Sequence, residues 1–138
     1  MKRDLGRVAL TVVMVTIGIL HFTHTEAFAS IVPDYLPWHE GLVLVSGVFE
    51  IGLGMALQFE RTRVLAAYGL VALFIAVFPA NVNMALHPDQ PIAGVAVQPG
   101  ALALWLRLPV QLVLIWWAWR YTRSDQLARP SDLASPST

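Results

Sequence analysis

The stretch "VLAAYGLVALFIAVFPANVNMAL", residues 64–86, is 23 residues long and contains no charged side chain. At about 1.5 Å per residue, a helix of this length crosses the ~30 Å hydrocarbon layer of a bilayer. Three further apolar stretches of similar length cover residues 8–28, 41–59 and 101–119. The pattern predicts an all-α fold, a four-transmembrane-helix bundle.

The composition of the 138-residue chain agrees with a membrane location. Hydrophobic residues make up 57%, charged residues only 13%, and the mean hydropathy is +0.62. Soluble domains carry about 25% charged residues, so the lipid bilayer is the expected surrounding of this chain. We expect a membrane domain over residues 1–123 and a disordered cytoplasmic tail over residues 124–138. The expected helices cover residues 5–28, 40–59, 63–86 and 101–121.

The basic residues predict the orientation, because lysine and arginine concentrate in cytoplasmic flanks. They precede the first span, fill the loop between the second and third, and follow the fourth: Lys2, Arg3, Arg7, Arg61, Arg63, Arg120, Arg123 and Arg129. The other two connecting segments, residues 29–40 and 87–100, contain none. We therefore expect a multi-pass protein of the inner or plasma membrane with both termini in the cytoplasm.

The first span has a second interpretation. A basic start, an apolar run and the sequence Ala27, Phe28, Ala29 also match a signal peptide with an A-x-A cleavage site. Cleavage there would remove His21 and leave three spans. The continuous apolar run favours a retained helix.

Five polar side chains fall in one layer of the predicted outer half, and each helix contributes at least one. A charge in the hydrocarbon costs about 2.5–3.5 kcal/mol on insertion scales, so such residues usually face the bundle interior. The depth of each residue, counted inward from the predicted outer boundary, selects the candidate ligand-binding residues His21, Glu50, Asn81, Arg107 and Gln111.

The spacing of these residues places them on helix faces that also carry small residues. Positions three or four apart share a face, and glycines allow helices to approach closely in a membrane. The faces are Gly18 with His21 and Thr25, Gly47 with Glu50 and Gly54, and Arg107 with Gln111. On the third helix Asn81 and Asn83 lie on different faces, and the sequence does not decide which lines the interior.

Three roles fit the polar layer. In the first, Glu50 and Arg107 form a buried ion pair that only fixes helix packing. In the second, the layer lines a pocket for a small polar or quinone-like molecule, with Arg107 contacting an anion or carbonyl oxygen and His21 and Glu50 carrying protons. In the third, His21 and His24 contribute to a haem or metal site, although no further ligand is evident.

The sequence gives little support to other classes of function. Cysteine is absent, which excludes a disulfide relay and a thiolate metal site. The basic residues form no stripe typical of a nucleic-acid surface, so we expect no nucleic-acid partner. No self-sufficient catalytic motif is present, and whether the chain is an enzyme stays open.

Five segments, in order, resemble the DoxX-like family of small integral membrane proteins. They are "GILHF" at residues 18–22, "IVPDYLP" at 31–37, "SGVFEIGLG" at 46–54, "VFPANVNMA" at 77–85 and "RLPVQLVLIWWA" at 107–118. The resemblance implies a four-helix membrane bundle and an association with membrane redox chemistry, since one branch of that family resembles a subunit of thiosulfate:quinone oxidoreductase. Many relatives have a proline soon after the histidine, where this chain has "THTEA" at residues 23–27.

The resemblance also implies that His21, Glu50, Asn81, Arg107 and Gln111 are the matching polar positions. The leading interpretation is an auxiliary or ligand-binding component of a membrane redox system, with a quinone as a candidate cofactor. Expected partners are the lipid bilayer and either a membrane oxidoreductase subunit or further copies of the chain. A structural or assembly protein is the alternative.

Overall fold

The computed structural model describes residues 4–123, and all the regular structure in this range is helical. The helices are α1 (Leu5–Thr23), α2 (Thr25–Ala29), α3 (His39–Ala56), α4 (Arg63–Leu86) and α5 (Ala101–Tyr121). All except α2 are long and apolar enough to cross a membrane. The predicted four-transmembrane-helix bundle is confirmed, and the chain is a multi-pass membrane protein.

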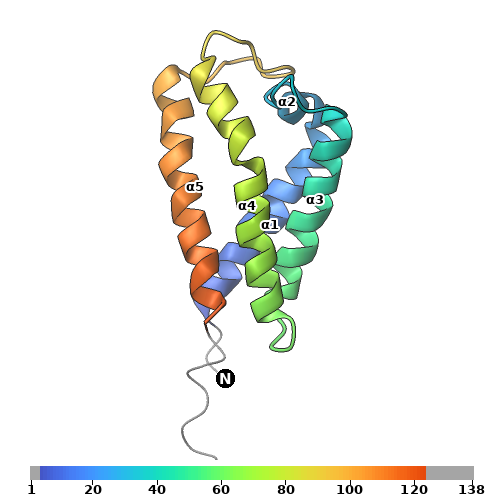
Figure 1. Ribbon diagram of the computed structural model, residues 1–138, viewed down its shortest axis with the longest axis vertical. Helices are drawn as coiled ribbons and strands as arrows, with labels where there is room; N and C mark the ends of the chain where they lie inside the picture. The colour runs from blue at the N-terminus through green and yellow to red at the C-terminus, as the bar shows by residue number, and fades with distance from the viewer. Residues whose placement is uncertain (1–3, 124–138) are drawn as a thin grey trace, which may run out of the picture.

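The bundle consists of two helix pairs. α1 packs along α3, α4 packs along α5, and contacts between α3 and α4 join the pairs. In Figure 1, α1 crosses behind α4 from the foot of α5 toward the top of α3. The end of the bundle where α1 begins and α5 stops is called the terminal end below. The opposite end is covered by the cap, which consists of α2 and the segments 30–38 and 87–100.

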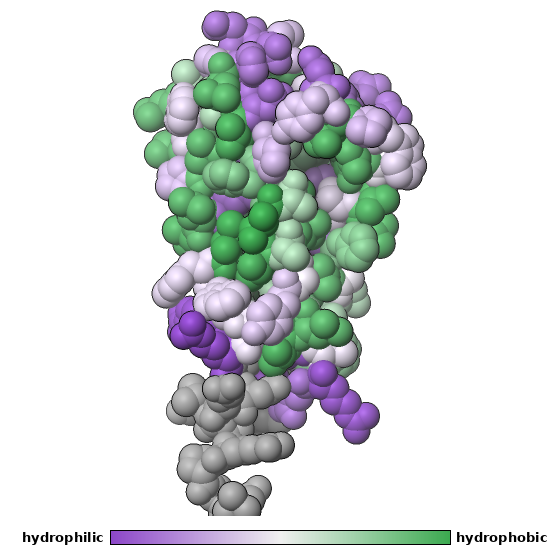
Figure 2. Space-filling view, viewed as in Figure 1, coloured by the Kyte–Doolittle hydropathy of each residue, from purple (hydrophilic) through white to green (hydrophobic). Residues whose placement is uncertain are grey.

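Apolar side chains cover the middle of the face seen in Figure 2, and polar surface borders them at both ends. Apolar side chains of the long helices are more than half exposed, as a surface in contact with lipid requires, among them Val12, Val48, Ile75, Leu112 and Val113. The exposure of so much apolar surface in all four long helices agrees with a bilayer as the solvent.

Glycines bring α1 and α3 into close contact, as the small-residue faces predicted. A Cβ atom added to Gly18 would lie 2.9 Å from the Gly47 carbonyl oxygen, and one added to Gly54 would lie 2.9 Å from the Cβ of Met14. At this close approach the Thr11 hydroxyl donates a hydrogen bond of 2.8 Å to the Gly54 carbonyl. Close backbone approach of this kind drives helix association in membranes.

The well-packed hydrophobic core lies in the half of the bundle nearer the terminal end. Its buried members come from α1, α4 and α5 and from the residue that follows α3: Leu10, Met14, Leu57, Ala66, Ala67, Leu70, Phe74 and Ala118. These residues lie in the first half of α1, just after α3, in the first half of α4 and near the end of α5. The candidate site occupies the half of the bundle under the cap.

The expected continuous helix 5–28 is wrong, because α1 ends at Thr23 and the chain turns at His24 before α2 begins. The Thr25 hydroxyl donates to the His21 carbonyl at 2.8 Å, and the Thr23 hydroxyl contacts His24 Nδ1 at 2.8 Å. Threonine side chains that bond to nearby groups in this way compete with the helical pattern. The segment "THTEA" therefore ends the first span.

The second helix is also shorter than expected, since it begins at His39 and ends at Ala56. The Thr62 hydroxyl donates to the Ala56 carbonyl at 2.7 Å and satisfies that helix end. The third and fourth expected helices, 63–86 and 101–121, match α4 and α5. The tail expected over residues 124–138 lies outside the described residues.

Candidate functional site

A cavity of about 660 Å³ lies between the four long helices beneath the cap. All five candidate residues line it: His21 from α1, Glu50 from α3, Asn81 from α4, and Arg107 and Gln111 from α5. Most of the remaining wall is apolar, and Ile31, Val32 and Leu36 of the cap close its upper side. Cavities of about 300–1,000 Å³ with apolar walls and a few polar groups are typical of small-molecule sites.

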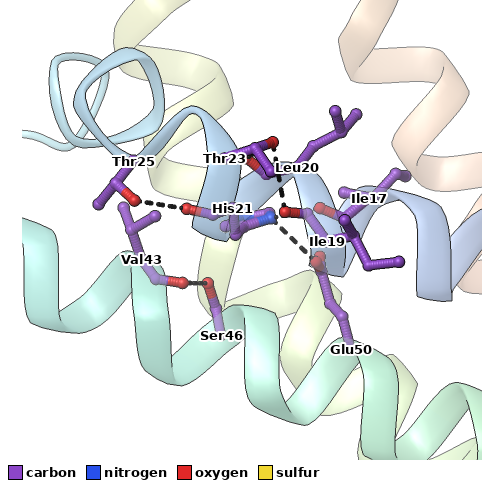
Figure 3. A network of polar contacts seen from close by, with 9 residues as sticks. All are labelled: Ile17, Ile19, Leu20, His21, Thr23, Thr25, Val43, Ser46 and Glu50. Carbon is purple, nitrogen blue, oxygen red and sulfur yellow. Dashed lines mark hydrogen bonds and ion pairs between the residues drawn. The ribbon is translucent and has the colours of Figure 1, made fainter.

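His21 and Glu50 form an ion pair across the α1–α3 contact (Figure 3). His21 Nδ1 lies 3.1 Å from Glu50 Oε2 and 2.8 Å from the Ile17 carbonyl oxygen one turn earlier in α1. A carbonyl and a carboxylate can only accept, so a hydrogen on Nδ1 can be donated to Ile17 or to Glu50. With that hydrogen in place, the imidazole gains or loses its second proton at Nε2.

The surroundings of this pair fix its geometry. The ring of Phe28, in α2, stacks on the imidazole with centroids 4.0 Å apart and planes inclined by 19°. Glu50 is 4% exposed, and apart from the contact with His21 its Oε2 has no hydrogen-bond partner among residues 4–123. The carboxylate is thus buried, in ion-pair contact with His21, and able to accept a further donor.

A second polar cluster forms the opposite wall, where α4 meets α5. The Asn81 amide donates to Gln111 Oε1, and Gln111 Nε2 donates to the Phe74 carbonyl at 2.6 Å. Pro79 lacks an amide hydrogen and leaves the Ile75 carbonyl, next to Phe74, without its helical donor. Gln111 therefore holds α5 against the part of α4 that proline weakens.

Arg107 contributes the positive charge of the cavity. Its side chain is exposed and lines the cavity, and its Nη1 lies 3.9 Å from the sulfur of Met84. No carboxylate within residues 4–123 lies within ion-pair distance of it. A guanidinium inside a membrane-spanning helix with only a weak sulfur acceptor has most of its donors free for an anion or a carbonyl oxygen.

The expected ion pair between Glu50 and Arg107 is not formed. Glu50 lies on the glycine face of α3 that packs on α1, so its nearest cation is His21. Arg107 lies on α5, which packs on α4, and both residues face the cavity between the two helix pairs. Glu50 and Arg107, which the sequence places at a similar depth, therefore line the same cavity without contacting each other.

The two asparagines of α4 have different roles. Asn81 lines the cavity, whereas Asn83 Nδ2 donates to the Ile31 carbonyl at 3.2 Å and ties the cap to α4. Sequence reasoning missed Phe28, whose stacking on His21 depends on the turn at His24. It also missed the cap residues of the cavity wall, although the apolar Ile31 and Val32 between loop residues are a signal of burial.

The haem or metal interpretation gains no further ligand. His24 is exposed, and its Nδ1 contacts the Thr23 hydroxyl rather than the cavity. Within residues 4–123 no group of three or more histidine, cysteine, aspartate or glutamate residues is arranged to hold a metal ion.

Residues 10–122 match the family described as a domain of unknown function, DUF8561. The chain belongs to this family. The DUF8561 range extends from the first half of α1 to the residue after α5 and includes the cavity with all five polar residues. Comparison with curated proteins and with solved structures gives no match.

Proposed function

We propose that this protein is a DoxX-like, ligand-binding component of a membrane redox system, and that the cavity binds a small quinone-like molecule. The observation that carries the proposal is the convergence of five polar side chains from four membrane-spanning helices on one largely apolar cavity. A quinone has the matching chemistry, because its ring is apolar and its carbonyl oxygens accept hydrogen bonds.

Each polar group has a role in this proposal. Arg107 donates to a carbonyl oxygen, or to the negative charge that develops there on reduction. His21 Nε2 exchanges a proton with the ligand, and Glu50 stabilises the imidazolium form of His21. Asn81 and Gln111 hold the opposite wall. Reduction of a quinone takes up two electrons and two protons. We assign the electrons to a partner oxidoreductase subunit, and the protons pass one at a time through His21, which takes up a new proton from water after the first transfer.

The location proposed for the protein follows from its charges. An inner or plasma membrane, with the terminal end in the cytoplasm, would place Arg61, Arg63, Arg120 and Arg123 on the cytoplasmic side. The cavity would then lie in the outer half of the bilayer. Other copies of the chain are the alternative partner to an oxidoreductase subunit.

A structural or assembly role is the second candidate, and the polar contacts give it specific support. The His21–Glu50 pair joins α1 to α3, and Gln111 joins α5 to α4, so each contact strengthens a helix pair that is already packed. Arg107 separates the two candidates. Its polar contact with the protein is the weak one to the Met84 sulfur, which contributes little to a structural role, whereas a binding site uses its charge.

A binding titration with Arg107→Gln tests the proposal. The purified chain in lipid nanodiscs is titrated with para-benzoquinone and followed by quenching of tryptophan fluorescence. Loss of a charged hydrogen bond, about 1.5–3 kcal/mol, should weaken binding by roughly ten- to a hundredfold. Arg123→Gln, at the terminal end, is the matched control and should bind as the natural chain does. Absence of saturable binding to the natural chain would refute the proposal.

A further inference from the structure

Helices α3 and α4 pack closely near the terminal end and diverge under the cap. Leu53 of α3 packs directly on Gly69 of α4, where an added Cβ would lie 2.7 Å from the leucine Cδ2. Farther toward the cap, α4 leans toward α5 and away from α3 (Figure 1). The Leu53–Gly69 contact therefore marks the end of the close packing between the two helices.

The residues that continue these two faces toward the cap line the cavity. On α3 they are Phe49, Val45 and Leu42, which are 53%, 42% and 38% exposed. On α4 they are Leu73, Ala76 and Ala80. Positions three, four and seven residues apart share a helix face, so these side chains would interdigitate if the helices stayed together. They line an apolar slot along the α3–α4 side of the cavity.

The slot and the polar groups together define an amphiphilic site. From Leu42 to Leu53 the slot runs for roughly 16 Å along α3, at ~1.5 Å per residue. Its wall consists of hydrocarbon side chains and offers nothing to a polar ligand. The polar groups of the cavity are on the buried His21 and Glu50 and on Arg107 of α5. Polar surface within the apolar middle of the face in Figure 2 agrees with this arrangement.

We propose that the ligand is dissolved in the membrane, that it reaches the cavity between α3 and α4, and that its apolar tail stays in this slot. The inference rests on the proposed function and specifies its ligand class: an oxygen-bearing ring with a long hydrocarbon tail. Partition into the bilayer concentrates such a molecule around these helices. On the side of the cap the cavity is lined by the apolar residues Ile31, Val32 and Leu36.

Filling the slot from α4 tests the inference. Ala76→Trp puts a large ring between the helices, and Ala72→Trp is the matched control, since Ala72 is exposed one turn away and does not line the cavity. The two probes are para-benzoquinone without a tail and the same head with a decyl tail. Ala76→Trp should weaken decyl-benzoquinone binding at least tenfold, roughly the factor for about two unburied methylene groups. Binding of the tail-less head should weaken much less than binding of the decyl probe, because the head has no tail in the slot.

The outcomes separate the two proposals. Equal effects of Ala76→Trp on both probes, or equal effects of Ala76→Trp and Ala72→Trp, would overturn the slot while the binding of the tail-less head still supports the cavity. If neither probe binds the natural chain, the proposed function fails and the slot fails with it.

A second measurement uses the natural chain and does not depend on the folding of a variant. Decyl-benzoquinone with a photoreactive diazirine at the tail end should label residues 42–49 of α3 and 73–80 of α4. Labelling confined to the cap segment 87–100 would overturn the inference, because it would mean that the tail points toward water.

Discussion

His21 Nδ1 lies 3.1 Å from Glu50 Oε2, and the two side chains join α1 to α3 beside the cavity. Removal of one partner from a buried ion pair leaves the other uncompensated, whereas replacement of both by apolar residues often leaves stability unchanged. The Ile17 carbonyl oxygen, in the same helix as His21, also lies 2.8 Å from Nδ1 and helps to fix the imidazole, while Glu50 comes from α3 (Figure 3).

The first prediction concerns the coupling of these two residues. His21→Leu leaves the Glu50 carboxylate buried without its partner and should lower the unfolding free energy in detergent micelles. Adding Glu50→Leu should restore part of the loss, with a non-additivity of about 0.5–3 kcal/mol. A double variant whose loss equals the sum of the two single losses would show that the pair is not coupled.

The second prediction concerns the close approach of α1 and α3. A Cβ atom on Gly18 would lie 2.6 Å from Ile51 Cγ1 and 2.9 Å from the Gly47 carbonyl, so Gly18→Ala must push the helices apart. We expect a loss of about 1–3 kcal/mol, typical of overpacking, with a lower Tm in micelles. Gly52→Ala is the matched control, because nothing lies within 4 Å of its added Cβ. The claim fails if the two variants unfold at the same temperature.

The third prediction concerns membrane topology. Because the sequence contains no cysteine, a single introduced cysteine is the only thiol that can be labelled. Val97→Cys places a thiol in the cap, and Glu60→Cys places one in the loop at the terminal end. In intact spheroplasts a membrane-impermeant maleimide should label only the cap thiol, and lysis should expose the other. Labelling of Glu60→Cys alone would reverse the proposed orientation, and equal labelling would contradict the two-ended arrangement.

The sequence predicts the helix faces well because glycines and polar residues three or four positions apart must share a side. Gly18 with His21 and Gly47 with Glu50 are buried together for this reason. The predicted pairing of Glu50 with Arg107 was wrong, because residue spacing determines a helix face but not which helix packs on it. The turn at His24 depends on threonine hydroxyl bonds, and the cavity depends on the divergence of α3 and α4. Neither the turn nor the divergence of the two helices produces a periodic pattern in the sequence.

The decisive question is whether the cavity contains a molecule in the cell. The chain should be extracted in polymer nanodiscs without detergent, and the bound molecules identified by mass spectrometry and absorption spectroscopy. We predict that a quinone-class amphiphile co-purifies in near-equimolar amount, and that it is lost from Ala80→Phe, in which a ring fills the cavity wall. Recovery of bulk phospholipid alone, in the same proportion from both chains, would contradict a binding site and leave the polar residues as a structural contact between helices.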